Sequence, residues 1–143
     1  MTVAYAEERN TPDDRSQVDA VFRCVGDFAW LPLEDQIEAA TAVAGSGPGY
    51  VFAFSHHMLR AAMATGMSEE LADRLVRQTL LGASTPPTSD QRLPLAVKKA
   101  VTSKAGATEA ALAIFEAEGG LANLCRPAVA AAQNRSIELS AAE

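Results

Sequence analysis

The chain has 143 residues and a formal net charge of −6; 48% of its residues are hydrophobic and 21% are charged. This length and balance predict one principal globular domain with a core of its own, and the many alanines favour helix. A nucleic-acid surface is excluded, because phosphate binding needs clustered Lys and Arg and the basic residues here are scattered.

Residues 2–6 alternate weakly and predict a short strand, and a helix follows from about residue 12 to Gly26. Residues 28–31 predict a second short strand, which completes a strand–helix–strand piece. Residues 33–44 then predict a helix that ends at Gly45.

The segment Gly45-Ser46-Gly47 predicts a helix–loop–helix corner, because glycines let the backbone turn sharply and leave N–H groups open to a ligand. Pro48 suits the first turn of the next helix, which runs to about residue 65. That helix is apolar on several faces, and such a helix is normally buried. We therefore expect a partner subunit to cover it.

The remaining elements are helices separated by turns. Gly66 caps the preceding helix, Ser68 begins the next, and residues 84–94 predict a polar, proline-broken loop. A short helix spans residues 95–101, and a turn over residues 103–106 leads into a helix to residue 118. Gly119 and Gly120 separate it from a final helix that runs to about residue 139. Pro127 lies inside this last helix, where we expect a kink or a restart.

Few side chains suggest chemistry by themselves. Cys24 and Cys125 are far apart in no metal-ligand spacing, and we expect buried or half-buried thiols of a cytosolic protein. His56 and His57 are adjacent on a helix and point about 100° apart, which favours surface or interface histidines over metal ligands. No metal site is predicted. No signal peptide or membrane-spanning run is evident, so we expect a cytoplasmic protein without membrane contact.

The turn over residues 103–108 is the best candidate site. Backbone N–H groups at a helix start form a ready anion site, and Gly106 permits their exposure. A carboxylate fits there, held by Ser103 and the amides of Gly106, Ala107 and Thr108. The alternative is that Ser103 and Thr108 merely cap helices.

Several segments resemble pyrroline-5-carboxylate reductases in the family's own order. Residues 38–50 are similar to its Asp-Ala-x-Thr-Ala-x-Ser-Gly-Ser-Gly-Pro-Ala-Tyr signature, and residues 101–108 to its Val-x-Ser-Pro-Gly-Gly-(Thr/Ala)-Thr turn. The helix after that turn ends in residues 115–121, which are similar to the family's Leu-Glu-x-Gly-Gly end. Weaker similarities cover residues 25–30, 78–83 and 135–139.

The resemblance implies a mainly α protein, a helical dimerisation-domain bundle with a short N-terminal βαβ remnant of a Rossmann domain. Residues 1–32 would be the remnant of the nucleotide-binding domain, and residues 33–143 the helical dimerisation and substrate-binding domain. It implies a homodimer, possibly of higher order, acting on a small imine carboxylate, 1-pyrroline-5-carboxylate, which NADPH or NADH reduces to L-proline. Since most of a nucleotide-binding domain is missing, this chain alone is not expected to bind the cofactor tightly.

The resemblance also implies roles for single residues. Ser103, Gly106, Ala107 and Thr108 would hold the substrate carboxylate, and Thr108 would act as the catalytic residue beside the ring nitrogen. Ser46 and Gly47 would contact the cofactor, although their segment lacks the third glycine and the preceding strand of a dinucleotide fingerprint.

Departures from the family pattern leave alternatives open. Lys104 and Ala105 replace Pro and Gly inside the turn, and Ala111 replaces a usual Gly. If position 105 needs a positive φ, alanine would cost about 1 kcal/mol there. Lys104 would instead add a cation for the carboxylate. The alternatives are a non-catalytic helical dimerisation module or truncated gene product, or a related imine reductase with another substrate.

Overall fold

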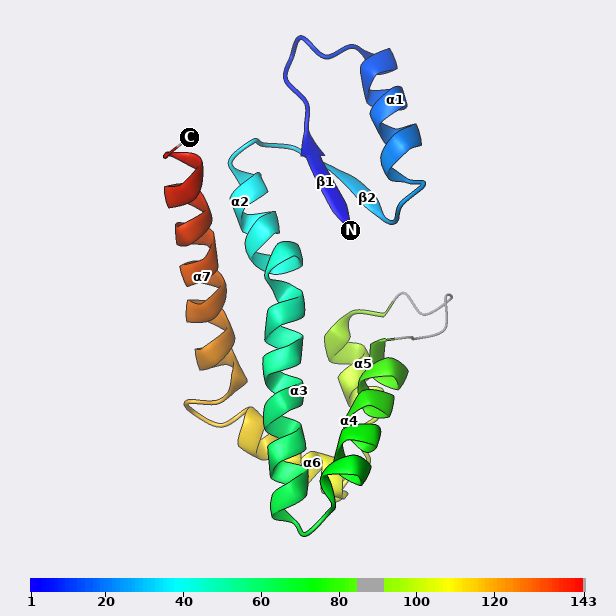
Figure 1. Cartoon of the computed structure of the whole chain (residues 1–143), viewed down its shortest axis with the longest axis vertical. Helices are drawn as coiled ribbons and strands as arrows, with labels where there is room; N and C mark the ends of the chain where they lie inside the picture. Colours follow the sequence, from blue (N-terminus) through cyan, green and yellow to red (C-terminus); the bar gives the residue numbers. More distant parts are fainter. Residues whose placement is uncertain (85–91, 143) are drawn as a thin grey trace. The chain divides into compact units, whose positions relative to one another are not determined.

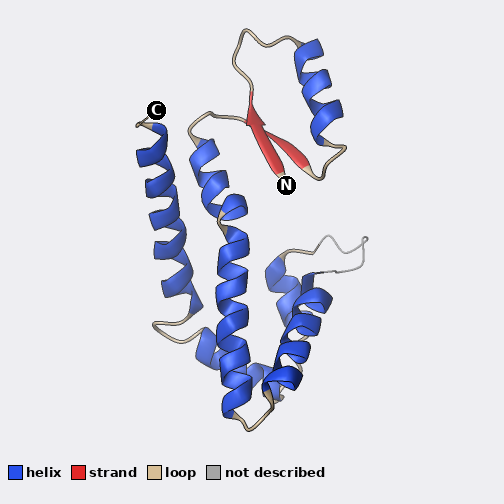
Figure 2. Ribbon diagram, viewed as in Figure 1, coloured by secondary structure: helices blue, strands red, loops and turns tan. Residues whose placement is uncertain are grey.

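The computed structural model describes residues 1–84 and 92–142 and confirms a mainly helical chain with a short N-terminal βαβ unit (Figures 1 and 2). Its contacts form two compact units: residues 1–48 with 126–143, and residues 49–125. The elements are β1 (Thr2–Tyr5), α1 (Pro12–Phe22), β2 (Phe28–Leu31), α2 (Gln36–Ala40), the π-helical turn η1 (Thr41–Gly45), α3 (Gly47–Ala64), α4 (Glu69–Ser84), α5 (Pro94–Ala100), α6 (Ala107–Phe115) and α7 (Leu121–Ser140).

In the first unit, β1 and β2 pair in parallel, with Thr2 opposite Phe28 and Tyr5 opposite Leu31. Parallel strands need a crossover connection, and α1 supplies it. Phe28 is buried and stacks on Phe22 of α1 with ring centroids 5.7 Å apart. These contacts give the βαβ unit a small aromatic core.

Helix α1 begins with a capping box. The Asp14 N–H donates to Thr11 Oγ1 at 3.2 Å, and the Thr11 N–H donates to Asp14 Oδ2 at 2.8 Å. The box satisfies amides that a helix start otherwise leaves open.

The predicted helix–loop–helix corner at residues 45–47 is wrong, because the chain stays helical from α2 through η1 into α3. The Ser46 N–H donates to the Thr41 carbonyl at 3.0 Å, which is the i→i+5 bond of a π-helical turn. Neither Gly45 nor Gly47 takes a positive φ. Pro48 has no N–H to continue an α-helical ladder, and the wider turn before it accommodates that loss.

In the second unit, a short turn joins α3 to α4, and the two helices run in roughly opposite directions from it (Figure 1). Gly66 has a φ of 95°, as its predicted capping position requires, and Ser68 Oγ accepts from the Leu71 N–H at 3.3 Å. The Phe54 ring of α3 lies 6.1 Å from the Phe115 ring of α6, centroid to centroid.

The later elements follow the prediction with shifted ends. Most of the predicted 84–94 loop, residues 85–91, lies outside the described residues. Helix α6 ends at Phe115 rather than at residue 118, and Gly119 then takes a φ of 80°. Helix α7 runs from Leu121 to Ser140 as one helix with Pro127 inside it, so no restart occurs there.

Little of the described chain is buried. The buried apolar residues are Ala6, Phe28, Ala42, Ala72 and Val76, whereas Phe52, Ile114 and Leu124 are among many large apolar side chains that remain exposed. Both cysteines are exposed, which corrects the expectation of buried or half-buried thiols. Because so many large apolar side chains stay exposed in a single chain, the prediction of a self-contained core is wrong.

Candidate functional site

The candidate site is the turn between α5 and α6 in the second unit. The Gly106 N–H donates to the Ser103 carbonyl at 3.1 Å, and this bond closes the turn. Ala105 has a φ of 57°, in the left-handed region that favours glycine. Position 105 therefore has the positive φ for which the sequence analysis expected an energetic cost of alanine.

Gly106 is required for the close approach of Ser103. A Cβ at position 106 would lie 2.5 Å from Ser103 Oγ and 3.1 Å from the Ser103 carbonyl oxygen. Gly106 is also the N-cap residue of α6, with an extended backbone, so that Ala107 and Thr108 form the first helical turn. The structure therefore brings the four predicted substrate residues into one short turn.

Two backbone amides and two hydroxyls of this turn form no hydrogen bond with residues 1–84 or 92–142. In the described part of the chain, no hydrogen bond uses the N–H groups of Ala107 and Thr108 or the hydroxyls of Ser103 and Thr108. Ser103, Ala107 and Thr108 are exposed. First-turn N–H groups carry the positive end of the helix dipole, so the turn offers donors to an anion.

Sequence reasoning missed Glu109. Its Oε2 accepts a hydrogen bond from the Ala105 N–H at 2.7 Å. The Ala105 amide is therefore occupied, as is that of Gly106, which the sequence had predicted to bind the carboxylate. The signal was available, since a Glu three residues after an N-cap is typical of a capping box.

Sequence reasoning also missed a link across the turn. Lys98 Nζ of α5 lies 2.7 Å from Glu116 Oε1 at the end of α6. Lys104, inside the turn, is exposed and forms no ion pair with any residue that the structure describes.

Ser46 and Gly47, the predicted cofactor contacts, lie at the start of α3 and are half-buried. The Ser46 N–H is taken by Thr41, so it is not an open amide as the corner interpretation supposed. Their contact with a cofactor stays a prediction.

The β1–α1–β2 unit does not fit a dinucleotide. Residues 6–11 contain no glycine that would let a pyrophosphate approach the backbone. The first turn of α1 is occupied by its own Thr11–Asp14 box, and Asp13 adds a second negative charge there. A pyrophosphate would meet carboxylates instead of open amides.

No group of three or more metal-ligating side chains is close enough to hold a metal ion among residues 1–84 and 92–142. The His56 and His57 rings contact each other edge to face, with ring centroids 5.4 Å apart.

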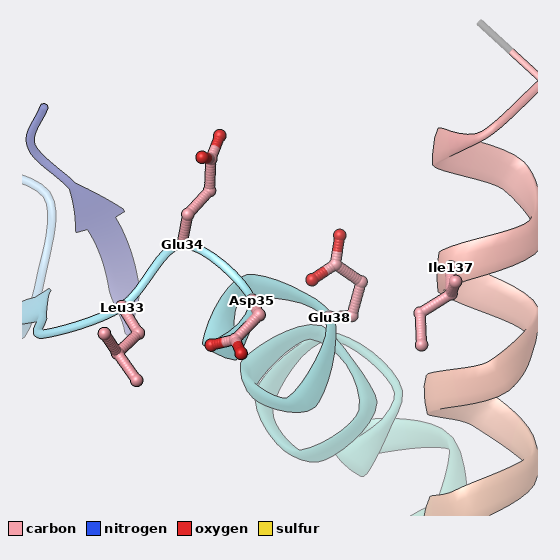
Figure 3. A pocket seen from close by; sticks show the side chains of 5 residues that line it. All are labelled: Leu33, Glu34, Asp35, Glu38 and Ile137. Carbon is pink, nitrogen blue, oxygen red and sulfur yellow. The ribbon is translucent and has the colours of Figure 1, made fainter.

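An open depression in the first unit is lined by Leu33, Ile137 and three carboxylates (Figure 3), and its acidic wall disfavours an anionic ligand. The carboxylates are Glu34, Asp35 and Glu38.

The fold is a short βαβ unit followed by helices that leave many large apolar side chains exposed, which is typical of domains that bind another protein surface. Residues 34–139 match the family model described as pyrroline-5-carboxylate reductase dimerisation. The chain belongs to the pyrroline-5-carboxylate reductase family.

Relatives with that name are similar over nearly the whole chain. The one from Pseudomonas aeruginosa is 40% identical over 95% of this chain and 50% of its own length. The one from Synechocystis is 33% identical over 97% of this chain and 51% of its own length. This chain thus spans about half the length of the curated relatives it matches.

Solved structures of proteins with the same family name are similar to this chain in fold. The pyrroline-5-carboxylate reductase of Coxiella burnetii aligns over 96% of this chain and 50% of its own length, with a TM-score of 0.87 and 35% identity. The Plasmodium falciparum pyrroline carboxylate reductase, solved with NADP bound, aligns over 94% of this chain and 50% of its own, with a TM-score of 0.77 and 26% identity. None of the described helices is long and apolar enough to cross a membrane.

Proposed function

We propose that this chain supplies the substrate-binding and dimerisation half of a pyrroline-5-carboxylate reductase, which reduces 1-pyrroline-5-carboxylate to L-proline. The observation that carries the proposal is the Ser103–Thr108 turn, where uncommitted N–H and hydroxyl groups occur in a chain of this family. The amides of Ala107 and Thr108 and the Ser103 hydroxyl bind the substrate carboxylate.

Thr108 is the proposed catalytic residue. Reduction of the imine adds hydride at carbon and a proton at the ring nitrogen, and a hydroxyl can both donate and accept a hydrogen bond. The Thr108 hydroxyl has no partner among the described residues, so it is available to orient the ring nitrogen and to relay the proton. NADPH or NADH, the family's hydride source, would be bound outside the β1–α1–β2 unit.

The same family membership supports a homodimer as the working form, and a cytoplasmic location stays a prediction. The exposed apolar faces of α3, α6 and α7 support the dimer, because one chain leaves them uncovered. Higher assembly, and the domain boundary near residue 33, also stay predictions.

The test is a titration of the isotopically labelled chain with L-proline, followed by amide chemical shifts. We expect the changes to centre on Ser103, Gly106, Ala107 and Thr108. Thr108→Ala should weaken binding by about 0.5–1.5 kcal/mol, the net contribution of one hydrogen bond.

Thr65→Ala is the matched control, since its hydroxyl donates to the Ala62 carbonyl at the end of α3. Shifts elsewhere, or equal affinity in the Thr108 variant, would contradict the proposal. A calorimetric titration with NADPH should show no micromolar binding.

The second candidate is a non-catalytic dimerisation module. The misfit of the βαβ unit to a dinucleotide favours it, as does the alanine at position 105. A dimer that binds neither L-proline nor an imine carboxylate at the turn would select this candidate.

A further inference from the structure

We propose that Glu109 is a positioning residue that holds the Ser103–Thr108 turn in its anion-binding form, an inference that rests on the proposed function. Its carboxylate accepts the Ala105 N–H at 2.7 Å. That amide belongs to the residue with left-handed backbone, where φ is 57°.

The bond acts on the conformation of Ala105. An L-residue with a Cβ disfavours the left-handed region, so Ala105 needs an interaction that exists only in that conformation. A charged acceptor on its N–H is such an interaction. Glycine, which the family pattern has at this position, would need no such support.

The conformation of Ala105 sets the direction of the donors that follow. Gly106 comes next in the chain, and its N–H bond to the Ser103 carbonyl closes the turn against Ser103 Oγ. If Ala105 left the left-handed region, Gly106 would rotate with it and the Ala107 and Thr108 amides would diverge. Glu109 itself makes no proposed contact with the substrate.

The charge of Glu109 works in the opposite direction. A carboxylate beside an anion site repels an anionic ligand, so its hydrogen bond favours binding while its charge opposes binding. The two effects separate in two variants. Glu109→Gln keeps an acceptor oxygen and removes the charge, whereas Glu109→Ala removes both.

The test compares L-proline affinity by amide-shift titration. We expect Glu109→Ala to raise the dissociation constant roughly three- to tenfold, the range of one hydrogen bond. Glu109→Gln should bind as tightly as the parent chain or more tightly. Glu118→Ala is the matched control, because Glu118 is exposed and has no partner in the described part of the chain.

Ala105→Gly should rescue Glu109→Ala, because glycine holds the left-handed conformation unaided. A residue that only stabilised the fold would change the melting temperature without this rescue of affinity. An unchanged dissociation constant in Glu109→Ala, or an equal loss in Glu109→Gln, would overturn the inference.

A readout without ligand separates this inference from the proposed function. In Glu109→Ala, hydrogen exchange at the Ala105 amide should accelerate, and the Gly106, Ala107 and Thr108 amide shifts should move. If these changes occur but the parent chain does not bind L-proline, the proposed function fails and the positioning role of Glu109 stands. If the Ala105 amide is unaffected, the positioning role fails whatever L-proline does.

Discussion

The Lys98 ammonium lies 2.7 Å from the Glu116 carboxylate and joins α5 to the end of α6, the two helices that flank the candidate turn. Both side chains are partly exposed, at 34% and 56%, so solvent screens the pair. We expect Lys98→Met to lower the free energy of unfolding by less than about 1 kcal/mol, with a smaller effect at high salt. Urea denaturation at fixed protein concentration measures it, and an effect that is large and insensitive to salt would contradict this prediction.

Ala105→Gly should stabilise the protein. The left-handed conformation costs alanine about 1 kcal/mol, and glycine adopts it without that cost. Part of this gain is offset because glycine has more conformational freedom in the unfolded chain. Ala111→Gly is the matched control, since position 111 lies inside α6, where glycine costs about 1 kcal/mol. The two substitutions should therefore shift the melting temperature in opposite directions. A destabilised Ala105→Gly variant would show that φ at this position is not positive in solution.

Gly120→Ala should destabilise the start of α7. A Cβ there would overlap the Phe115 carbonyl and lie 2.8 Å from the Ala117 carbonyl, and backbone atoms cannot move aside cheaply. We expect the free energy of unfolding, measured by urea denaturation, to fall by about 1–3 kcal/mol.

Gly82→Ala is the control for that substitution, because its Cβ would meet nothing within 4 Å in α4. It should stabilise by up to about 1 kcal/mol. Similar effects at positions 82 and 120 would contradict the contact described for Gly120.

Acid should weaken the start of α1. The backbone N–H of Thr11, followed by its hydroxyl, holds the pKa of Asp14 below its ordinary value. A folded-state pKa below the unfolded one stabilises the folded chain above about pH 4, and this contribution is lost as the pH falls through the folded-state pKa. Thr11→Ala removes the hydroxyl and keeps the backbone N–H, so it should raise the Asp14 pKa only in part in a carboxyl-carbon NMR titration, and an unmoved pKa would refute the hydroxyl as a cause.

The oligomeric state of variants tests whether the exposed apolar side chains form a dimer interface. Phe52 on α3 is 70% exposed and lies within the family match, so Phe52→Asp should shift a dimer toward monomer in light scattering. Val21 on α1 is 64% exposed and lies outside that match, and Val21→Asp should leave the mass unchanged. A monomeric parent chain at micromolar concentration would refute the dimer.

Local signals predicted most of the elements. Gly66, with its left-handed backbone, and Ser68, with its capping oxygen, mark one helix boundary correctly, because a local conformation explains each residue. The segment from Gly45 to Pro48 misled the prediction, since glycines and proline are compatible both with a break and with a widened helical turn. The choice depends on the bond from Ser46 to Thr41, which composition does not reveal.

The site was predictable only in part. The spacing and the family pattern indicated Ser103 and Thr108 as candidates, and both lie in one exposed turn, while their roles stay predictions. The partner of the Ala105 amide depends on the Glu109 rotamer, and the pairing of Lys98 with Glu116 depends on how α5 and α6 come together. Neither contact follows from the sequence pattern alone.

The π-helical turn at Thr41–Gly45 places one more residue in a turn than an α-helix would. Each residue of an α-helix advances about 100° around the axis, so a helical pattern counted along the sequence shifts by about that angle at this turn. Removing one residue from this turn would restore a uniform α-helix and leave the sequence of α3 intact. An apolar stripe counted from α2 at uniform spacing would therefore lose its register at residues 41–45.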